Sequence, residues 1–242
     1  MTILPGLTST EPDRMPAFVA DLRASDVREI ALFPTAIDRN EREALYRELG
    51  TIAGLRIPHV HLRTDCDEEE IGFLVRRFGT ELVNIHPEKS THPFGEVAHR
   101  FREMTYVENV QIPPDDRELE SLGGICPDYS HLESARRMGN DPYVETVERQ
   151  LRSYRIGCCH ISAIRDGEPN PWNGGPDHHN FRQLSDFDYM TRYADVLPER
   201  WLSLELENSL AEQLGAVEYV GRLLRARQLA GAQWTSSRVW SV

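Results

Sequence analysis

The sequence predicts an α/β fold in one domain, a closed (β/α)8 (TIM) barrel, on three observations. Short apolar runs alternate with longer amphipathic segments along nearly the whole chain. Eight such pairs in 242 residues average about 30 residues each, the size of a βα repeat in such a barrel. The alternative is a doubly wound open sheet, but GxGxxG and GxxxxGK, the phosphate loops typical of that class, do not occur in the sequence.

The strands are predicted at the short apolar runs, which are Thr2–Pro5, Arg28–Phe33, Arg56–Leu62, Leu82–His86, Tyr106–Val110, Gly124–Tyr129, Ile156–Ser162 and Trp201–Glu207. The amphipathic segments predict helices near Arg14–Ala24, Arg39–Ala53, Asp67–Phe78, Phe94–Glu103, Asp115–Leu122, Pro142–Tyr154, Ser185–Val196 and Ser209–Gln228. Helix-start signals support several of these: Asp67 or Asp65 before the third, Ser185 and Asp186 at the seventh, and a Ser209/Glu212 capping box at the eighth.

Two segments fall outside this repeat. Arg165–Gln183 is rich in Pro, Gly and Asn and is expected to form a long loop after the seventh strand, on the face where such barrels carry out chemistry. Residues 233–242 show no clear element. We therefore assign residues 1–232 to the barrel and residues 233–242 to a C-terminal tail.

Composition excludes several classes of protein. The formal net charge is −12, with 39 acidic against 27 basic residues, which disfavours a broad nucleic-acid-binding surface. There is no apolar run of about 18 residues to span a membrane and no basic-then-apolar leader, so a cytoplasmic location is expected. The four cysteines lack CxxC spacing and so indicate neither a disulfide scaffold nor a thiolate zinc site.

Imidazoles and carboxylates end six successive predicted strands. They are His59 and His61, His86, Glu108, Asp128 followed by His131, His160, and Glu205 with Glu207. A single such residue is usually a hydrogen-bonded core residue or a helix cap. Because the carboxyl ends of barrel strands converge, six in succession would crowd into one volume, where acids without a cation would resist ionisation.

This pattern predicts a divalent metal centre. Imidazole nitrogen and carboxylate oxygen suit Zn, Mn, Fe or Co, of which we expect Zn or Mn. Asp177 and His179 could add two ligands from the long loop. Cys126 and Cys158 lie two residues before Asp128 and His160, so they are expected to be small core residues one layer deeper.

From the second predicted strand onward, the motifs resemble those of the xylose isomerase-like TIM barrels, which include sugar isomerases, sugar epimerases and endonuclease IV-type apurinic endonucleases. The matching stretches are VEN at 107–109, GICPDYSH at 124–131, CHIS at 159–162, PDHH at 176–179 and the glutamate at Glu205, with Glu207 as the alternative register.

The epimerase branch of this resemblance implies one ion held by Glu108, Asp128, His160 and Glu205, with Glu108 and Glu205 also acting as catalytic acid and base through an enediolate. The endonuclease branch implies three zinc ions, with further ligands His61, His86, His131, Asp177 and His179. His59 could replace His61, because it has the same strand parity.

Departures from the endonuclease pattern favour the first branch. His86 is followed by Pro87, Glu88 and Lys89 instead of Pro-Gly-Ser, and the chain is acidic and short for that class. We therefore expect a metal-dependent isomerase or epimerase of a sugar or sugar phosphate, without nucleic acid or membrane as a partner. The alternatives are a phosphodiesterase acting at abasic sites and a metal-binding barrel without catalysis of its own, which could pair with another chain or with a copy of itself.

Two basic residues lie just beyond strand ends near the expected site. Arg63 follows the third predicted strand, and Lys89, the only lysine of the chain, follows the fourth. Either could bind a substrate phosphate, although a surface ion pair is the more frequent role of such residues.

Overall fold

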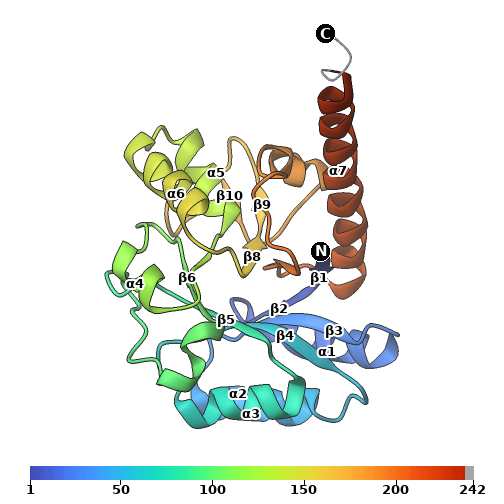
Figure 1. Cartoon of the computed structure of the whole chain (residues 1–242). Helices are drawn as coiled ribbons and strands as arrows, with labels where there is room; N and C mark the ends of the chain where they lie inside the picture. The colour runs from blue at the N-terminus through green and yellow to red at the C-terminus, as the bar shows by residue number, and fades with distance from the viewer. Residues whose placement is uncertain (238–242) are drawn as a thin grey trace.

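Parallel strands form two sheets in the computed structural model, which describes the backbone of residues 1–237 and the side chains of residues 1–227 (Figure 1). The larger sheet contains β2 (Gly6–Thr8), β3 (Glu29–Phe33), β4 (Arg56–His61), β5 (Leu82–Ile85), β6 (Thr105–Glu108) and β7 (Ile125–Cys126), in that order. The smaller has the order β1-β11-β8, with β1 (Thr2–Leu4), β8 (Cys158–Ile161) and β11 (Trp201–Leu204). The protein is therefore a mixed α/β structure with a six-stranded parallel sheet.

Two sets of contacts connect the sheets. β1 and β2 are successive parts of one segment, divided at Pro5, which has no N–H to donate to a ladder. As a result, β1 pairs with β11 while β2 pairs with β3. At the opposite edges, isolated parallel bridges join Ile125 to Ile156 and Asp128 to His160.

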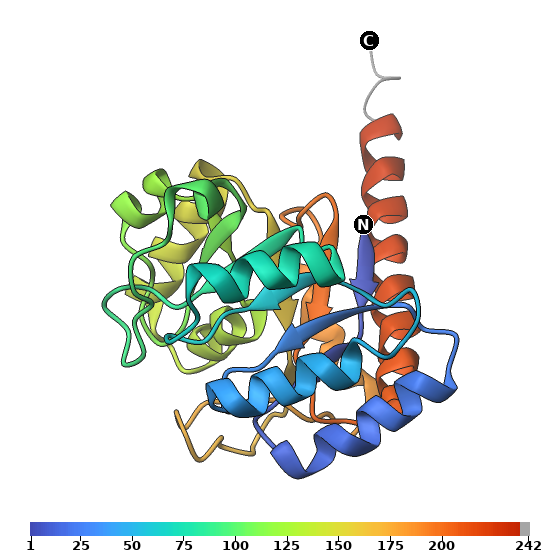
Figure 2. The same cartoon turned by 90° about the horizontal axis from the view of Figure 1, so that it is seen from below.

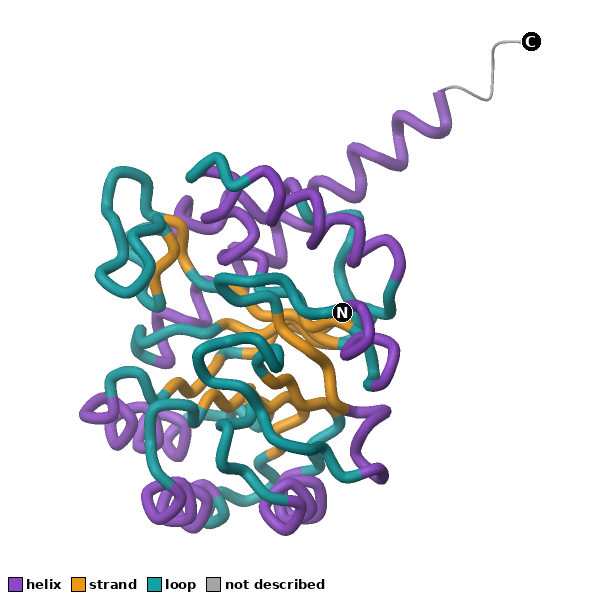
Figure 3. Tube along the Cα trace, turned by 90° about the vertical axis from the view of Figure 1, so that its left-hand side faces the viewer, coloured by secondary structure: helices purple, strands orange, loops and turns teal. Residues whose placement is uncertain are grey.

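Helices lie outside the strands. The α-helices are α1 (Met15–Ala24), α2 (Arg39–Leu49), α3 (Glu68–Phe78), α4 (Asp116–Ser121), α5 (Tyr129–Arg137), α6 (Asp141–Ser153) and α7 (Leu210–Ser237). The 3-10 helices are η1 (Pro12–Arg14), η2 (His99–Met104) and η3 (Leu184–Arg192). From below, α1, α2 and α3 lie side by side across one face of the larger sheet (Figure 2). Most strands gather at the centre, while the end of α7 projects from the body (Figure 3).

Capping residues explain where several helices begin. The Asp67 side chain accepts a hydrogen bond from the backbone N–H of Glu70 and begins α3, as predicted. Ser209 and Glu212 bond to each other's backbone N–H groups before α7, which confirms the predicted capping box. Gly79, with φ 67°, ends α3 in the left-handed region that glycine adopts most readily.

The structure corrects several predicted elements. The Phe94–Glu103 segment is helical only in η2; its first part stays irregular and contains Gly95, whose conformational freedom disfavours a helix. The Ser185–Val196 segment is the 3-10 helix η3 instead of an α-helix. The predicted Gly124–Tyr129 strand ends early, because the Asp128 side chain caps α5, a helix that the sequence did not predict.

Two further differences concern the irregular segments. An antiparallel pair joins the start of the long loop to its interior: β9 (Ala163–Ile164), directly before the loop, pairs with β10 (Asp177–His178) inside it. Residues 233–237 of the predicted tail continue α7, and residues 238–242 lie outside the described residues.

The core has two parts. The larger part packs the strands against the helices. The smaller is contributed by strands of both sheets and consists of Leu4, Ala31, Phe33, Tyr106, Cys126, Cys158 and Trp201. Gly157 makes room for this part, since a Cβ there would lie 2.0 Å from the Tyr106 ring. In residues 1–237, no helix has both the length and the apolar character needed to cross a membrane.

Candidate metal centre

Six of the nine predicted ligands occupy the upper of two polar layers on the strands. Because strand side chains alternate between faces, residues two apart point the same way. The upper layer, at or just beyond the carboxyl ends of the strands, contains His61, His86, Glu108, Asp128, His160 and Glu205. Two positions earlier on the same segments lies a lower layer of His59, Asn84, Tyr106, Cys126, Cys158 and Ser203.

Four upper-layer residues, Glu108, Asp128, His160 and Glu205, form what we call the inner cluster, and none is more than 6% exposed. Nε2 of His160 lies 3.5 Å from Oε1 of Glu108, 3.3 Å from Oδ2 of Asp128 and 3.6 Å from Oε2 of Glu205. Within the described part of the chain, this nitrogen has no hydrogen-bond partner. Three carboxylates from β6, the end of β7 and the end of β11 therefore surround one unpartnered ring nitrogen.

The inner cluster has the properties of a cation site. Burial by itself would lower the pKa of His160, but the adjacent Glu108 and Asp128 carboxylates raise it well above the ordinary value. Burial would likewise raise the pKa of Glu108, but His160 and His61 hold it well below the usual range. Buried acids at this density need compensating positive charge, and a divalent ion with N and O ligands fits the donor set.

Asp128 is held by its helix and by a neighbouring strand. Its Oδ1 accepts hydrogen bonds from the backbone N–H groups of Ser130 and His131, at 2.7 and 3.0 Å, and from the Ser130 hydroxyl. The Asn109 side chain accepts from the Asp128 N–H at 3.0 Å and donates to its carbonyl at 2.9 Å. These bonds leave Oδ2 directed toward His160.

A second group joins the inner cluster through Glu108. His61, His86 and Glu108 present ligand atoms within 4.8 Å of one another. Nε2 of His61 lies 3.4 Å from Oε2 of Glu108, and the His61 and His86 ring centroids are 4.8 Å apart. Among the residues that the structure describes, neither ring nitrogen of buried His61 has a hydrogen-bond partner. This group could hold a second ion.

A third set of candidate ligands, His131 and Asp177, lies beside Asp128. Nε2 of His131 is 3.5 Å from Oδ2 of Asp128, and its Nδ1 is 3.2 Å from Oδ2 of Asp177. Although burial opposes it, the carboxylates of Asp128 and Asp177 raise the pKa of His131 to about 10. Burial would raise the pKa of Asp177, but the hydrogen bond and positive charge of His131 lower it to about 2. The β9–β10 pair thus carries Asp177 to the cluster.

Contacts distinguish Glu205 from Glu207, the two glutamates that the sequence left open as the ligand after the last strand. Oε1 of Glu207 accepts from Thr10 at 2.8 Å and Oε2 from Asn180 at 3.2 Å, so Glu207 is bonded away from the cluster that Glu205 joins. His179 lies at the margin, where its Nε2 is 4.0 Å from Oε2 of Glu205 and its side chain is 30% exposed.

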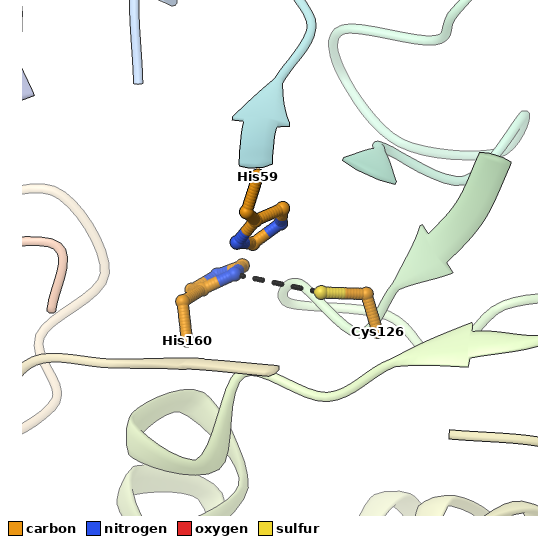
Figure 4. Close-up of side chains that lie close together, drawn as sticks. All are labelled: His59, Cys126 and His160. Atoms are coloured by element: carbon orange, nitrogen blue, oxygen red, sulfur yellow. Dashed lines mark hydrogen bonds between the residues drawn. The ribbon is translucent and has the colours of Figure 1, made fainter. Parts of the chain in front are cut away.

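His59 lies in the lower layer, with both ring nitrogens engaged. Nδ1 is 2.8 Å from the Ser203 hydroxyl oxygen, and Nε2 is 3.0 Å from the Asn84 amide oxygen. His59, Cys126 and His160 nevertheless lie close together, and Sγ of Cys126 is 3.7 Å from Nδ1 of His160 (Figure 4). Cys126 and Cys158 are fully buried, as predicted for core cysteines.

The two predicted substrate-binding residues have local partners. Arg63 donates to the Ile37 carbonyl at 2.5 Å. Lys89 is 72% exposed in its side chain and pairs with Asp115 at 2.9 Å. Neither side chain is among the contacts of the inner cluster in residues 1–227.

Sequence analysis missed the residues that support the ligands. Asn84 donates to Oε2 of Glu108 at 2.7 Å, Asn109 bonds to the Asp128 backbone, and Ser203 contacts His59. The strand period that placed Cys126 beneath Asp128 also places Asn84 beneath His86 and Ser203 beneath Glu205. Applied to every strand, that signal would have found two of the three.

Compared with models of protein families and with curated proteins, the chain shows no match. The resemblance to the xylose isomerase-like barrels therefore stays a prediction, and the site is interpreted from its own geometry.

Proposed function

We propose that this protein is a divalent-metal-dependent isomerase or epimerase of a small sugar or sugar phosphate, built on a single (β/α)8 barrel. The observation that carries this proposal is the approach of two buried carboxylates, Glu108 and Glu205, to the same His160 nitrogen, at 3.5 and 3.6 Å. Such a pair can serve both as ligands and as proton-transfer groups.

The strand pairings support one closed barrel. Counting β1 with β2 as one strand gives the cyclic order β1/β2, β3, β4, β5, β6, β7, β8, β11, in which every neighbour is paired or bridged in parallel. A barrel of this kind carries its active site at the carboxyl ends of the strands, and the inner cluster lies at that end.

The residues that would hold the ion are Glu108, Asp128, His160 and Glu205. When bound, a divalent ion supplies Lewis acidity that makes the carbon next to a substrate carbonyl more acidic. Glu108 removes the proton from that carbon and Glu205 returns it, or the reverse. Each acid–base group of this kind contributes about 10²–10⁴-fold to the rate.

Proton exchange tests the proposal. Glu108→Gln and Glu205→Gln should each retain part of the metal but lose incorporation of solvent deuterium into aldoses, ketoses and their phosphates, measured by NMR. Glu207→Gln is the matched control, because that carboxylate bonds to Thr10 and Asn180, and it should exchange at the wild-type rate. Undiminished exchange in Glu108→Gln would contradict the proposal.

A second candidate function is metal-assisted hydrolysis of a phosphodiester at abasic sites. It is favoured by the two additional groups around the inner cluster, His61 with His86 and His131 with Asp177, which provide ligands for more than one ion. Three tightly held zinc ions together with cleavage of abasic DNA would favour this function. A single labile manganese ion would favour the isomerase or epimerase.

A further inference from the structure

Three buried side chains form a hydrogen-bonded chain beneath Glu108, which we call the Ser203–His59–Asn84 relay. The residues belong to β11, β4 and β5, and each is at most 1% exposed. The Ser203 hydroxyl contacts Nδ1 of His59 at 2.8 Å, Nε2 of His59 contacts the Asn84 amide oxygen at 3.0 Å, and the Asn84 amide nitrogen contacts Oε2 of Glu108 at 2.7 Å.

Chemistry sets the direction of every bond in the relay. An ionised carboxylate only accepts, so the Asn84 amide nitrogen must face Glu108 and its oxygen must face His59. An amide oxygen also only accepts, so Nε2 of His59 carries a proton. In the neutral ring, Nδ1 then accepts from the Ser203 hydroxyl. The relay therefore specifies one tautomer of His59.

The relay also gives the two oxygens of Glu108 different surroundings. Oε2 receives the Asn84 amide and lies 3.4 Å from Nε2 of His61, whereas Oε1 lies 3.5 Å from Nε2 of His160. With Oε2 held by Asn84, the carboxylate keeps Oε1 turned toward the inner cluster. Rotation of the carboxylate would break a buried hydrogen bond and leave the amide unpartnered.

We propose that Asn84 is a positioning residue for Glu108 and that His59 and Ser203 act by fixing the Asn84 amide. This inference rests on the proposed metal centre, toward which Glu108 is oriented. It also assigns a role to His59 that differs from the ligand role considered from the sequence, since both of its ring nitrogens are engaged in the relay. Partners that orient a metal ligand typically change metal affinity 10–100-fold when removed, by order of magnitude.

Metal affinity is the first test, measured on the full chain by chelator competition with Zn²⁺ and by the visible spectrum with Co²⁺. Asn84→Ala should weaken binding by roughly 10–100-fold and alter the Co²⁺ spectrum. His59→Leu, which removes the donor to Asn84, should have a similar but smaller effect. His59→Gln, whose amide can still donate to Asn84, should restore most of the affinity.

Thr105→Val is the matched control. Thr105 is buried on β6, the strand of Glu108, and its hydroxyl donates to Phe101 instead of the relay. This variant should lose some stability yet keep wild-type affinity and spectrum. A loss of affinity in Thr105→Val equal to that in Asn84→Ala would mean that any buried change on these strands disturbs the site, and would overturn the positioning role.

The tautomer of His59 provides a test that needs neither metal nor substrate. In ¹⁵N NMR of the metal-free wild-type protein, we expect a protonated Nε2 and an unprotonated Nδ1 for His59. The opposite tautomer would overturn the relay. Wild-type metal affinity in Asn84→Ala would overturn the positioning role alone, whereas a wild-type chain that binds neither ion would overturn both this inference and the proposed function.

Discussion

The inner cluster and the residues around it differ in how their positions are set. Glu108, Asp128, His160 and Glu205 are buried and converge on one nitrogen, and their side chains or backbones are tied to neighbouring strands. The outer group, by which we mean His61, His86, His131, Asp177 and His179, approaches the cluster as separate pairs. His131 lies in the first turn of α5, and Asp177 and His179 come from the long loop.

This difference indicates that the site has a rigid centre, to which His61 on β4 also belongs by its packing, and an adaptable margin formed by the ligands from the long loop. Ligands on packed strands keep their geometry whether or not an ion is bound, whereas ligands on loops can change partners at lower cost. The inner cluster is therefore expected to dominate affinity for the first ion, and the outer group to decide whether further ions bind.

The largest expected effect is a difference in metal affinity between variants of the inner cluster and variants of the outer group. His160→Gln should weaken Zn²⁺ binding by more than about 100-fold, beyond the range typical of residues that only orient a ligand. His179→Gln should weaken it by no more than about 10-fold. Competition with a chromophoric chelator measures both, with His178→Gln as control because that ring bonds to the Glu168 carbonyl. Equal losses at His160 and His179 would remove the distinction between centre and margin.

Removal of metal should lower thermal stability, since the acids of the inner cluster would lose their compensating charge. An ion at 100 times its dissociation constant stabilises the folded chain by about 2.7 kcal/mol. For a domain of this size, that corresponds to a decrease in Tm of roughly 5–10 °C on chelation. Calorimetry with and without EDTA checks the value. His160→Gln should abolish the difference, and a wild-type Tm that EDTA leaves unchanged would contradict a bound ion.

Raising the pH should lower the stability of the metal-free chain but increase its affinity for metal. Carboxylates raise the pKa of His131 to about 10 and that of His160 well above its ordinary value, against the effect of burial, so both rings hold protons in the metal-free chain. Stability from groups with raised pKa is complete below the unfolded value of about 6.5 and is lost as pH rises through the folded value. The metal-free chain should thus lose stability toward pH 10.

Metal binding must displace the same protons, so affinity should increase as pH rises from about 6 to about 9. Calorimetric titrations in buffers of different ionisation enthalpy would count the protons released on binding. Release of none at pH 7 would show that the inner cluster is not protonated in the metal-free chain, and would contradict the charge balance inferred for it.

The smallest effect on stability and metal affinity is expected for Lys89, which lies outside both the inner cluster and the outer group. Lys89→Ala breaks only an exposed ion pair with Asp115, so it should leave the free energy of unfolding nearly unchanged and should not alter metal affinity. Denaturant unfolding and chelator competition check both. If turnover of a phosphorylated sugar, but not of its free form, fell in this variant, Lys89 would bind the phosphate despite its pairing with Asp115.

The strand and helix pattern was largely predictable because it depends on local periodicity. All eight predicted helices correspond in part or in full to observed α-helical or 3-10 segments, but the missed α5 shows the limit of periodicity. The side chain of Asp128 caps that helix, so the residue that looked like a strand position ends the strand instead. An apolar run with a polar end is compatible with either outcome, and a hydrogen bond decides between them.

The same division applies to the site. Residue types and the two-residue period were enough to predict which acids and imidazoles share a layer, because side-chain direction in a strand is a local property. Which of His59 and His61 faces the cluster, and whether Glu205 or Glu207 joins it, depended on how far each strand is shifted against its neighbours. That shift is set by pairings between residues distant in the chain, such as Ser203 with His160 and His61 with Asn84, and no local pattern encodes them.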